Sequence, residues 1–433
     1  MSQSKPDTLA ATATAATRIK SIFGGSVGNL IEWYDFYVYS FFSLYFAKAF
    51  FPTAEPTVQL LNAALIFGLG FFIRPIGGWI LGRYADRRGR RAALTLSVFI
   101  MCLGSLLIAI CPTYATAGWG AAAILVAARL LQGLSLGGEY GTSATYLSEV
   151  ATAQHRGFYS SFQYVTLIAG QLLATVTLLL LQQLFTAGQL EAFGWRIPFL
   201  IGAALALVGF WLRRNLVETD EFAAADRAGT NRHPFHELLR HKREVAIVLG
   251  LTAGGTLAFY TYTTYMPKFM VNTVGLSRDT ATLISTGTLF IFMCLQPLFG
   301  AISDRIGRRP VLMFFGIMGT LFTWPILSAI QHTHSAWSAF WLILAALVIV
   351  SGYTSINAVV KAELFPAGVR ALGVGLPYAI AVSIFGGSAE YVALFLKSQG
   401  VEQAFYWYVT ATIFASLLVY GFMRDTKAKS LIR

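Results

Sequence analysis

Apolar runs of about 20 residues follow one another along almost the whole chain, with short polar breaks between them. A helix of this length crosses roughly 30 Å of hydrocarbon, and so many such runs need lipid as their solvent. The 433 residues are 56% hydrophobic and 12% charged, whereas soluble domains carry about 25% charged residues. The sequence therefore predicts an all-α integral membrane protein.

We predict about twelve membrane-spanning helices from these runs. They cover residues 22–47, 57–81, 92–112, 118–148, 157–185, 195–215, 245–271, 279–300, 310–330, 336–363, 371–396 and 403–423.

The net charge of +12 is explained by where the basic residues lie, and it does not indicate a nucleic-acid partner. Most of the 32 Lys and Arg residues fall in segments that share one side of the membrane in a twelve-helix topology. Since basic loops are retained in the cytoplasm, we expect both termini to be cytoplasmic. The exceptions are Arg74 and Arg129 within helices, and Lys48, Arg196, Lys268, Arg278 and Lys397 on the opposite side.

A long polar connection over residues 213–244 divides the chain into two similar halves. The ten residues from Gly82 to Arg91 match those from Gly300 to Arg309 at six positions, with an offset of 218. This repeat predicts two six-helix bundles. We place an amino-terminal tail at 1–21, the bundles at 22–215 and 245–424, a central cytoplasmic loop at 216–244 and a carboxyl-terminal tail at 425–433.

The repeated loop predicts a gate on the cytoplasmic side. Its Gly residues permit close helix contact and a turn with positive φ, and its Asp lies where an arginine can pair with it. Ion pairs between the halves would form when the transporter opens outward and break when it opens inward. A second repeated spacing adds Glu149 with Arg156 and Glu363 with Arg370 to the candidates, which also include Asp86, Arg90, Asp304 and Arg308.

The loop after the second and eighth helices resembles the hallmark of the major facilitator superfamily. Residues 28–39, 74–78 and 133–140 are similar to the metabolite:proton symporter family within it. Residues 158–168 and 385–394 strongly resemble bacterial members that carry α-ketoglutarate. The resemblance implies the major facilitator fold, with two pseudo-symmetric six-helix bundles, a place in a bacterial inner membrane, and proton-coupled uptake of α-ketoglutarate (2-oxoglutarate).

Six ionisable residues fall well within the predicted spans, namely Glu32, Asp35, Arg74, Arg129, Glu139 and Glu390. Each costs about 3 kcal/mol at a helix centre, so each must face a cavity or another charge. The planar fork of arginine binds a carboxylate through two hydrogen bonds, which makes Arg74 and Arg129 candidates for binding an anionic solute. Both arginines also lie on stripes of small residues, so a structural salt bridge remains the alternative.

By residue count, the second half has no basic residue at a comparable depth. Lys268 and Lys397 fall near the outer face and Lys361 near the inner one. We therefore expect an asymmetric site, in which one bundle supplies the charge and the other supplies shape and neutral hydrogen bonds. The candidate neutral residues of the second bundle are Tyr260, Tyr262, Thr263, Tyr353 and Asn357. Further candidates for substrate binding in the first half are Tyr37, Gln163 and Tyr164.

Four carboxylates and two arginines within the spans carry a formal charge of −2 before a ligand enters. A dianion would add to this uncompensated charge, so we expect protonation to accompany binding. Asp35 is the first candidate for the proton carrier, with Arg129 holding it ionised until the substrate competes for that arginine. Glu32 and Glu139 are second candidates, and Glu390 is expected to reach water near the outer end of its helix.

Related solutes remain open at this point, including citrate, shikimate, and proline or betaine. The quaternary ammonium of betaine would suit the carboxylates and tyrosines. We expect no enzymatic activity, because the six histidines lie outside the predicted membrane core and no phosphate-binding loop has its usual context. We also expect a monomer in the lipid bilayer, without cofactor, metal or nucleic acid.

Overall fold

The computed structural model describes residues 15–53, 55–88, 90–137, 139–214 and 238–432. The first half contains α1 Ala15–Phe50, α2 Pro56–Phe72, α3 Arg74–Arg88, α4 Arg90–Ile110, α5 Tyr114–Ala117, α6 Trp119–Leu136, α7 Glu139–Val150, α8 Arg156–Leu184, α9 Ala187–Ala192, a 3-10 turn Gly194–Arg196 and α10 Ile197–Arg214. The second half contains α13 Lys242–Tyr260, α14 Met266–Phe269, α15 Arg278–Ile306, α16 Arg308–His332, α17 Ala336–Thr354, α18 Asn357–Leu364, α19 Arg370–Ala381, α20 Ala389–Ser398 and α21 Gln403–Phe422. Three π-helical segments, Thr261–Tyr265, Met270–Val274 and Val382–Gly386, interrupt the second half, and a 3-10 turn Lys427–Lys429 follows α21.

The predicted spans correspond to helices along the whole described chain. Nine helical stretches among the described residues are long and apolar enough to cross a membrane. The three remaining predicted spans are filled by α1, α4 and α10. The structure thereby confirms the predicted all-α membrane fold with about twelve spans.

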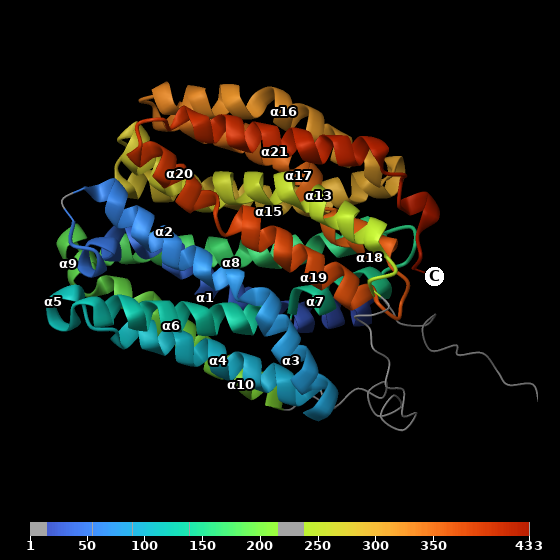
Figure 1. Cartoon of the computed structure of the whole chain (residues 1–433), viewed down its shortest axis with the longest axis horizontal. Coiled ribbons are helices and arrows are strands. Elements are labelled where there is room, and N and C mark those ends of the chain that lie inside the picture. Colours follow the sequence, from blue (N-terminus) through green and yellow to red (C-terminus); the bar gives the residue numbers. More distant parts are fainter. Residues whose placement is uncertain (1–14, 54, 89, 138, 215–237, 433) are drawn as a thin grey trace, which may run out of the picture.

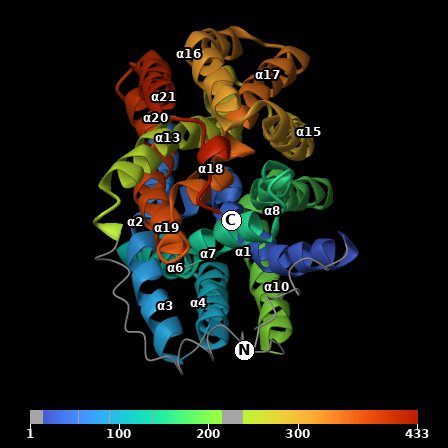
Figure 2. The ribbon, with the colours of Figure 1, turned by 90° about the vertical axis from the view of Figure 1, so that its right-hand side faces the viewer.

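The helices form two bundles whose long axes run in a similar direction (Figure 1). α3, α4, α6 and α10 lie on one side of the molecule, and α16, α17 and α21 lie on the other (Figures 1 and 2). The contact surface between the bundles, called the seam below, is formed where α8 packs on α15, α2 on α20, and α3 and α7 on α19. Movement of one bundle relative to the other must therefore rearrange these helix pairs.

Glycines permit the closest approach across the seam. A Cβ atom at Gly157 of α8 would lie 2.7 Å from the carbonyl oxygen of Gly300 in α15, and one at Gly300 would lie 2.6 Å from that of Gly157. Gly307 has φ of 99° at the turn into α16. The second copy of the repeated loop thus uses its two glycines as the sequence predicts, whereas Gly89 of the first copy lies outside the described residues.

The small-residue stripes that run through α2 and α3 and along α6 also mark close contacts. A Cβ atom at Gly133 would lie 2.0 Å from the carbonyl oxygen of Gly70, and one at Gly137 would lie 2.0 Å from that of Arg74. Backbone contact at this distance holds the start of α3 firmly against α6. It therefore fixes the backbone from which the Arg74 side chain extends.

Candidate functional site

Arg74, the first residue of α3, is a buried cation surrounded by aromatic rings. Its guanidinium carbon lies 4.0 Å from the ring centre of Phe71, 4.4 Å from that of Phe36 and 5.2 Å from that of Trp33. Among the described residues, its Nε and Nη2 atoms have no hydrogen-bond partner. Aromatic faces stabilise the charge but accept no strong hydrogen bonds, so Arg74 retains donors for a carboxylate.

Tyrosines from both bundles meet beside Arg74. The Tyr37 hydroxyl of α1 donates to that of Tyr260 in α13 over 3.2 Å, and the Tyr260 ring packs edge-on against Phe71. Tyr164 of α8 is buried and packs against Phe259. Tyr353 of α17 lies close to Tyr260, because its hydroxyl shares a hydrogen bond over 3.4 Å with Thr256, one helical turn before Tyr260.

The structure therefore brings Tyr37, Tyr164 and Tyr260 together at the seam. Gln163 is buried next to Tyr164 in the chain. Their binding of substrate stays a prediction.

Lys361 of α18 is a second buried cation near these tyrosines. Its Nζ donates to Asn357 Oδ1 over 2.8 Å and to the Tyr140 hydroxyl over 3.4 Å, and it lies 4.1 Å from the Tyr378 ring centre. The Tyr140 and Tyr378 rings stack with their centres 3.5 Å apart, which joins α7 to α19 across the seam. Tyr140 also donates to Asn357 over 2.9 Å.

This position differs from the one predicted near the inner face, apart from the other candidates, because Lys361 lies beside tyrosines at the seam. Counting residues along a helix locates the Cα atom, whereas the long stem of lysine carries its ammonium group well away from it. Lys361 follows two valines in an apolar stretch and is fully buried. The sequence signal for this residue was a lone lysine in an apolar stretch. It was missed because the depth predicted from residue count placed Lys361 near the inner face.

Tyr262 does not share the environment of Tyr260, and its binding of substrate stays a prediction. It faces the interior of the second bundle, where it lines a small apolar space with Phe315, Thr323 and Ile413. Residues two apart on a helix point in nearly opposite directions, so both tyrosines cannot face the seam. Thr263 by contrast accepts a hydrogen bond from Gln171 of α8 over 3.2 Å.

Arg129 of α6 lies within the first bundle and forms a network with Asp35. Its Nη1 donates to Gln132 Oε1 over 2.6 Å, and Gln132 Nε2 donates to Asp35 Oδ2 over 2.8 Å. The guanidinium also lies 4.2 Å from the Phe36 ring centre. No contact of 4.0 Å or less joins the Arg129 and Asp35 charges among the described ion pairs, so Gln132 bridges them.

Asp35 is tightly enclosed. A Cβ atom at Gly202 of α10 would lie 2.2 Å from Asp35 Oδ1, and that oxygen has no hydrogen-bond partner in the described part of the chain. Glu32 is also buried in α1. The side chain of Glu139 lies outside the described residues.

Glu390 does not reach water, contrary to expectation. It is 3% exposed and pairs with Lys268, which is 1% exposed, over 2.6 Å. Lys268 also donates to Ser40 of α1 over 2.6 Å. Burial of both charges is possible because each has an ionic partner, and the pair joins the second bundle to α1.

At the end of the molecule that carries residues 425–432, called the tail-side end, Asp304 joins the two bundles. Its carboxylate accepts from the backbone nitrogens of Gly157 and Phe158 at 2.8 Å each, at the start of α8. It also accepts from Arg308 Nη1 over 2.8 Å. A carboxylate at a helix N-terminus is favoured by the free backbone N–H groups and the helix dipole.

The four residues of the second repeated spacing form pairs in an unexpected combination. Arg370 of α19 pairs with Glu149 of α7 across the seam, while Glu363 of α18 accepts from Arg308 over 3.5 Å. Arg156 donates to Ser430 of the carboxyl-terminal tail over 3.2 Å. The side chains of Asp86 and Arg90 lie outside the described residues, so only the second copy of the loop can be followed.

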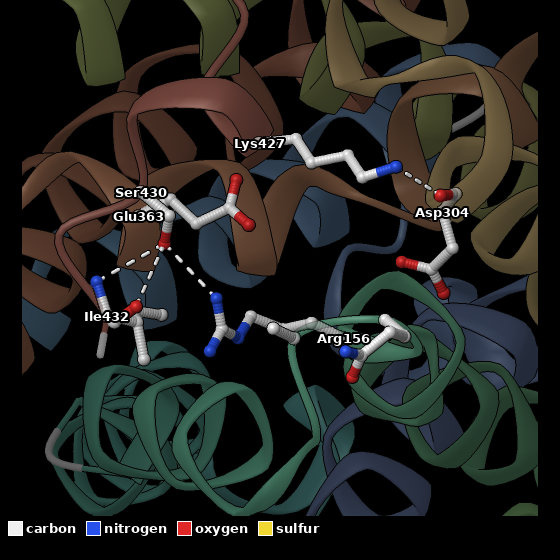
Figure 3. Close-up of a pocket in the computed structure, with 8 residues that line it drawn as sticks. Arg156, Asp304, Glu363, Lys427, Ser430 and Ile432 are labelled. Carbon is white, nitrogen blue, oxygen red and sulfur yellow. Dashed lines mark hydrogen bonds between the residues drawn. The ribbon is translucent and has the colours of Figure 1, made fainter.

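The tail covers a pocket of about 370 Å³ between the bundles (Figure 3). Lys427 donates to the carbonyl oxygen of Asp304, and Arg370 Nη2 donates to that of Leu431. The lining includes two cations, Arg156 and Lys427, and two carboxylates, Asp304 and Glu363. Because these charges balance, the pocket lacks the surplus positive charge that would suit a dianion.

Comparison with known proteins agrees with this architecture. The family model described as "Sugar (and other) transporter" matches residues 22–228 and 213–433. The chain is 56% identical to the alpha-ketoglutarate permease of Escherichia coli over 96% of this chain and 95% of that protein. It is 34% identical to the citrate-proton symporter of Klebsiella pneumoniae over 95% and 93% of the two chains.

A solved structure of the xylose transporter of Escherichia coli, in a partially occluded inward-open conformation, shares the fold. It superimposes with a TM-score of 0.78 at 19% identity, covering 96% of this chain and all of the other.

Proposed function

The chain belongs to the sugar and other transporter family of the major facilitator superfamily, and we propose that it takes up α-ketoglutarate together with protons by alternating access. The observation that carries the proposal is Arg74, a buried guanidinium with unused donors beside tyrosines of both bundles. An anionic solute fits this charge, whereas a cation does not. The similarity to the alpha-ketoglutarate permease of Escherichia coli supports this particular dicarboxylate.

One carboxylate of the substrate binds the Arg74 guanidinium through charge-assisted hydrogen bonds. Phe71 and Phe36, which now cover the cation, provide an apolar surround in which such bonds are strong. Tyr37 and Tyr260 supply hydroxyls from the two bundles. Binding then draws the bundles together around the solute.

The proton travels on Asp35. Its ionised form is costly where Oδ1 has no donor and Gly202 excludes water, so taking up a proton relieves that cost. Gln132 transmits the state of Asp35 to Arg129, because one amide bonds to both. Arg129 thus acts in coupling rather than in substrate binding, and Glu32 and Glu139 are further carboxyls for proton transfer.

The charged contacts at the tail-side end act as the cytoplasmic gate. Asp304 at the start of α8 and the Arg370–Glu149 pair both cross the seam, so both must break before the site opens to that side. The positive charge of the loops supports a cytoplasmic position for this end and for both termini. The protein works as a monomer in the bacterial inner membrane.

Uptake by purified protein in proteoliposomes tests the proposal. With an acidic exterior, radiolabelled α-ketoglutarate should accumulate above its external concentration, and a protonophore should abolish the accumulation. Citrate, shikimate, proline and betaine serve as competitors. Accumulation of betaine without α-ketoglutarate would overturn the proposal, and uptake that ignores the pH gradient would overturn proton coupling.

A further inference from the structure

The second bundle contains two fully enclosed lysines whose surroundings differ. Lys268 pairs with the Glu390 carboxylate over 2.6 Å and also donates to Ser40. Lys361 has only neutral partners among the described residues, namely the Asn357 amide oxygen and the Tyr140 hydroxyl. An ammonium group has three donors and a full charge, and neutral groups compensate that charge only in part.

We propose that Lys361 binds the second carboxylate of the substrate, opposite the carboxylate held by Arg74. This inference rests on the proposed function and deepens it, because it makes the site a clamp with one cation from each bundle. The substrate class becomes a short-chain dicarboxylate. A solute with one carboxylate would leave one of the two buried cations without an anionic partner.

The tyrosines between the two cations support this geometry. Tyr353, whose ring centre lies 6.0 Å from Lys361 Nζ, shares a hydrogen bond over 3.4 Å with Thr256, one helical turn before Tyr260. The Tyr260 ring packs against Phe71, which covers Arg74. The three rings near Lys361 belong to Tyr140, Tyr353 and Tyr378, at 5.4, 6.0 and 4.1 Å. Rings offer a cation a weak and replaceable partner, so a carboxylate can take their place.

The location of Lys361 at the seam links binding to movement. Its partner Tyr140 is in α7 of the first bundle, while Lys361 and Asn357 are in α18 of the second. Separation of α7 from α18 and α19 removes Tyr140 from Lys361. A bound dicarboxylate joins Arg74 of one bundle to Lys361 of the other, and thereby favours the state in which the bundles are close.

The alternative is that Lys361 only holds α7 against α18 through its hydrogen bonds. A structural role of this kind would affect every solute equally, whereas binding of the second carboxylate would affect dicarboxylates alone. Comparison of α-ketoglutarate with 2-oxopentanoate, which has the same chain length and one carboxylate, separates the two roles.

The test measures KM and kcat for both solutes in proteoliposomes containing wild-type protein, K361Q or K361R. For K361Q we expect the KM for α-ketoglutarate to rise by about 30-fold, as loss of one charge-assisted contact predicts. The inhibition constant of 2-oxopentanoate against α-ketoglutarate uptake should stay unchanged or decrease in K361Q. K361R keeps the charge and should restore much of the affinity for α-ketoglutarate.

An unchanged KM for α-ketoglutarate in K361Q, or an equal loss for both solutes, would overturn the inference. Failure of wild-type protein to transport α-ketoglutarate would instead overturn the proposed function, so the two failures are distinguishable. Thermal unfolding of each purified variant identifies loss of folding. If K361Q does not fold, K361M takes its place, because an apolar side chain of similar length removes the buried charge, and an unchanged KM for α-ketoglutarate in K361M contradicts the inference.

Discussion

Two of the regions that contain buried cations differ in the kinds of group that surround them. At the tail-side end, Arg308 and Arg370 each contact a carboxylate. At the centre, Arg74 and Lys361 contact aromatic rings, hydroxyls and an amide, and no carboxylate of a described residue lies within 4.0 Å of them.

The difference indicates what each region can do. A cation paired with a protein carboxylate has its charge satisfied in the closed state, so its pair can work as a latch that forms and breaks. A cation surrounded by neutral groups has a charge that is only partly compensated, and an anionic solute can supply the missing negative charge. The central region is therefore suited to binding and the tail-side end to gating.

Substitution of Arg74 should give the largest effect on uptake. R74Q is expected to lower kcat/KM for α-ketoglutarate by at least about 100-fold, roughly 3 kcal/mol, because a buried carboxylate loses its charged partner. R74K should fall between R74Q and wild type, since lysine cannot bind bidentately. Initial uptake rates over a range of concentrations measure the loss.

Arg83 offers a matched control in the same helix. It is exposed and lies over Trp79, so R83Q should transport like wild type. Normal uptake by R74Q would show that Arg74 does not bind the substrate. The proposed difference between binding cations at the centre and gating cations at the tail-side end would then fail.

Substitution of Asp35 should uncouple transport from protons. D35N is expected to lose accumulation driven by a pH gradient, which for wild type is about tenfold per pH unit for each proton carried. It should retain exchange of internal for external solute, because Arg74 is intact. Uptake with and without a gradient, together with counterflow, measures both activities.

Two further variants sharpen this prediction. R129Q should show the same defect as D35N, and the double variant should be no worse, because Gln132 joins the two residues in one network. S105A, which removes only one acceptor of Gln132, should stay coupled. Full pH-driven accumulation by D35N would exclude Asp35 as the carrier.

Breaking the Arg370–Glu149 pair should favour opening at the tail-side end. Glu149 is partly exposed, so the expected shift is about 1 kcal/mol, or roughly a fivefold change in population. A cysteine at Ser303, a buried residue of α15 that lies beside Gly157 of α8, is placed in a chain whose native cysteines are replaced by serine. Its rate of maleimide labelling reports opening of the seam. R370Q should be labelled faster than its parent.

The exchanged pair R370E with E149R provides the control. It restores an ion pair with reversed direction and should return the labelling rate toward that of the parent. Equal labelling of all three proteins would show that this pair does not hold the end closed.

Removal of residues 428–433 should have the smallest effect. It deletes the contacts of Arg156 with Ser430 and of Arg370 with Leu431, but keeps Asp304 at the start of α8. We expect a rise in labelling of about twofold or less, as for loss of partly solvated hydrogen bonds, with an unchanged KM for α-ketoglutarate. A large change in KM would place the tail in the binding region instead.

Hydropathy alone determined the twelve spans, because the length and apolarity of each helix are local properties that the bilayer requires. Repetition in the sequence also predicted the gate candidates at the tail-side end, whose gating role stays a prediction. It predicted the close helix contact at Gly300 as well, because Gly300 belongs to the repeated loop. Arg74 could be singled out because an arginine in the middle of an apolar run has few explanations.

Only the tertiary structure decided which charges meet. The pairing of Lys268 with Glu390, the Gln132 bridge between Arg129 and Asp35, and the opposite directions of Tyr260 and Tyr262 all depend on side-chain direction and on contacts between distant helices. Lys361 is the clearest case, because its ammonium group lies at the seam while its place in the sequence indicates a helix end. Sequence thus singled out six charged residues within the spans because such charges are costly in lipid, and packing decided which buried charges remain available to a solute.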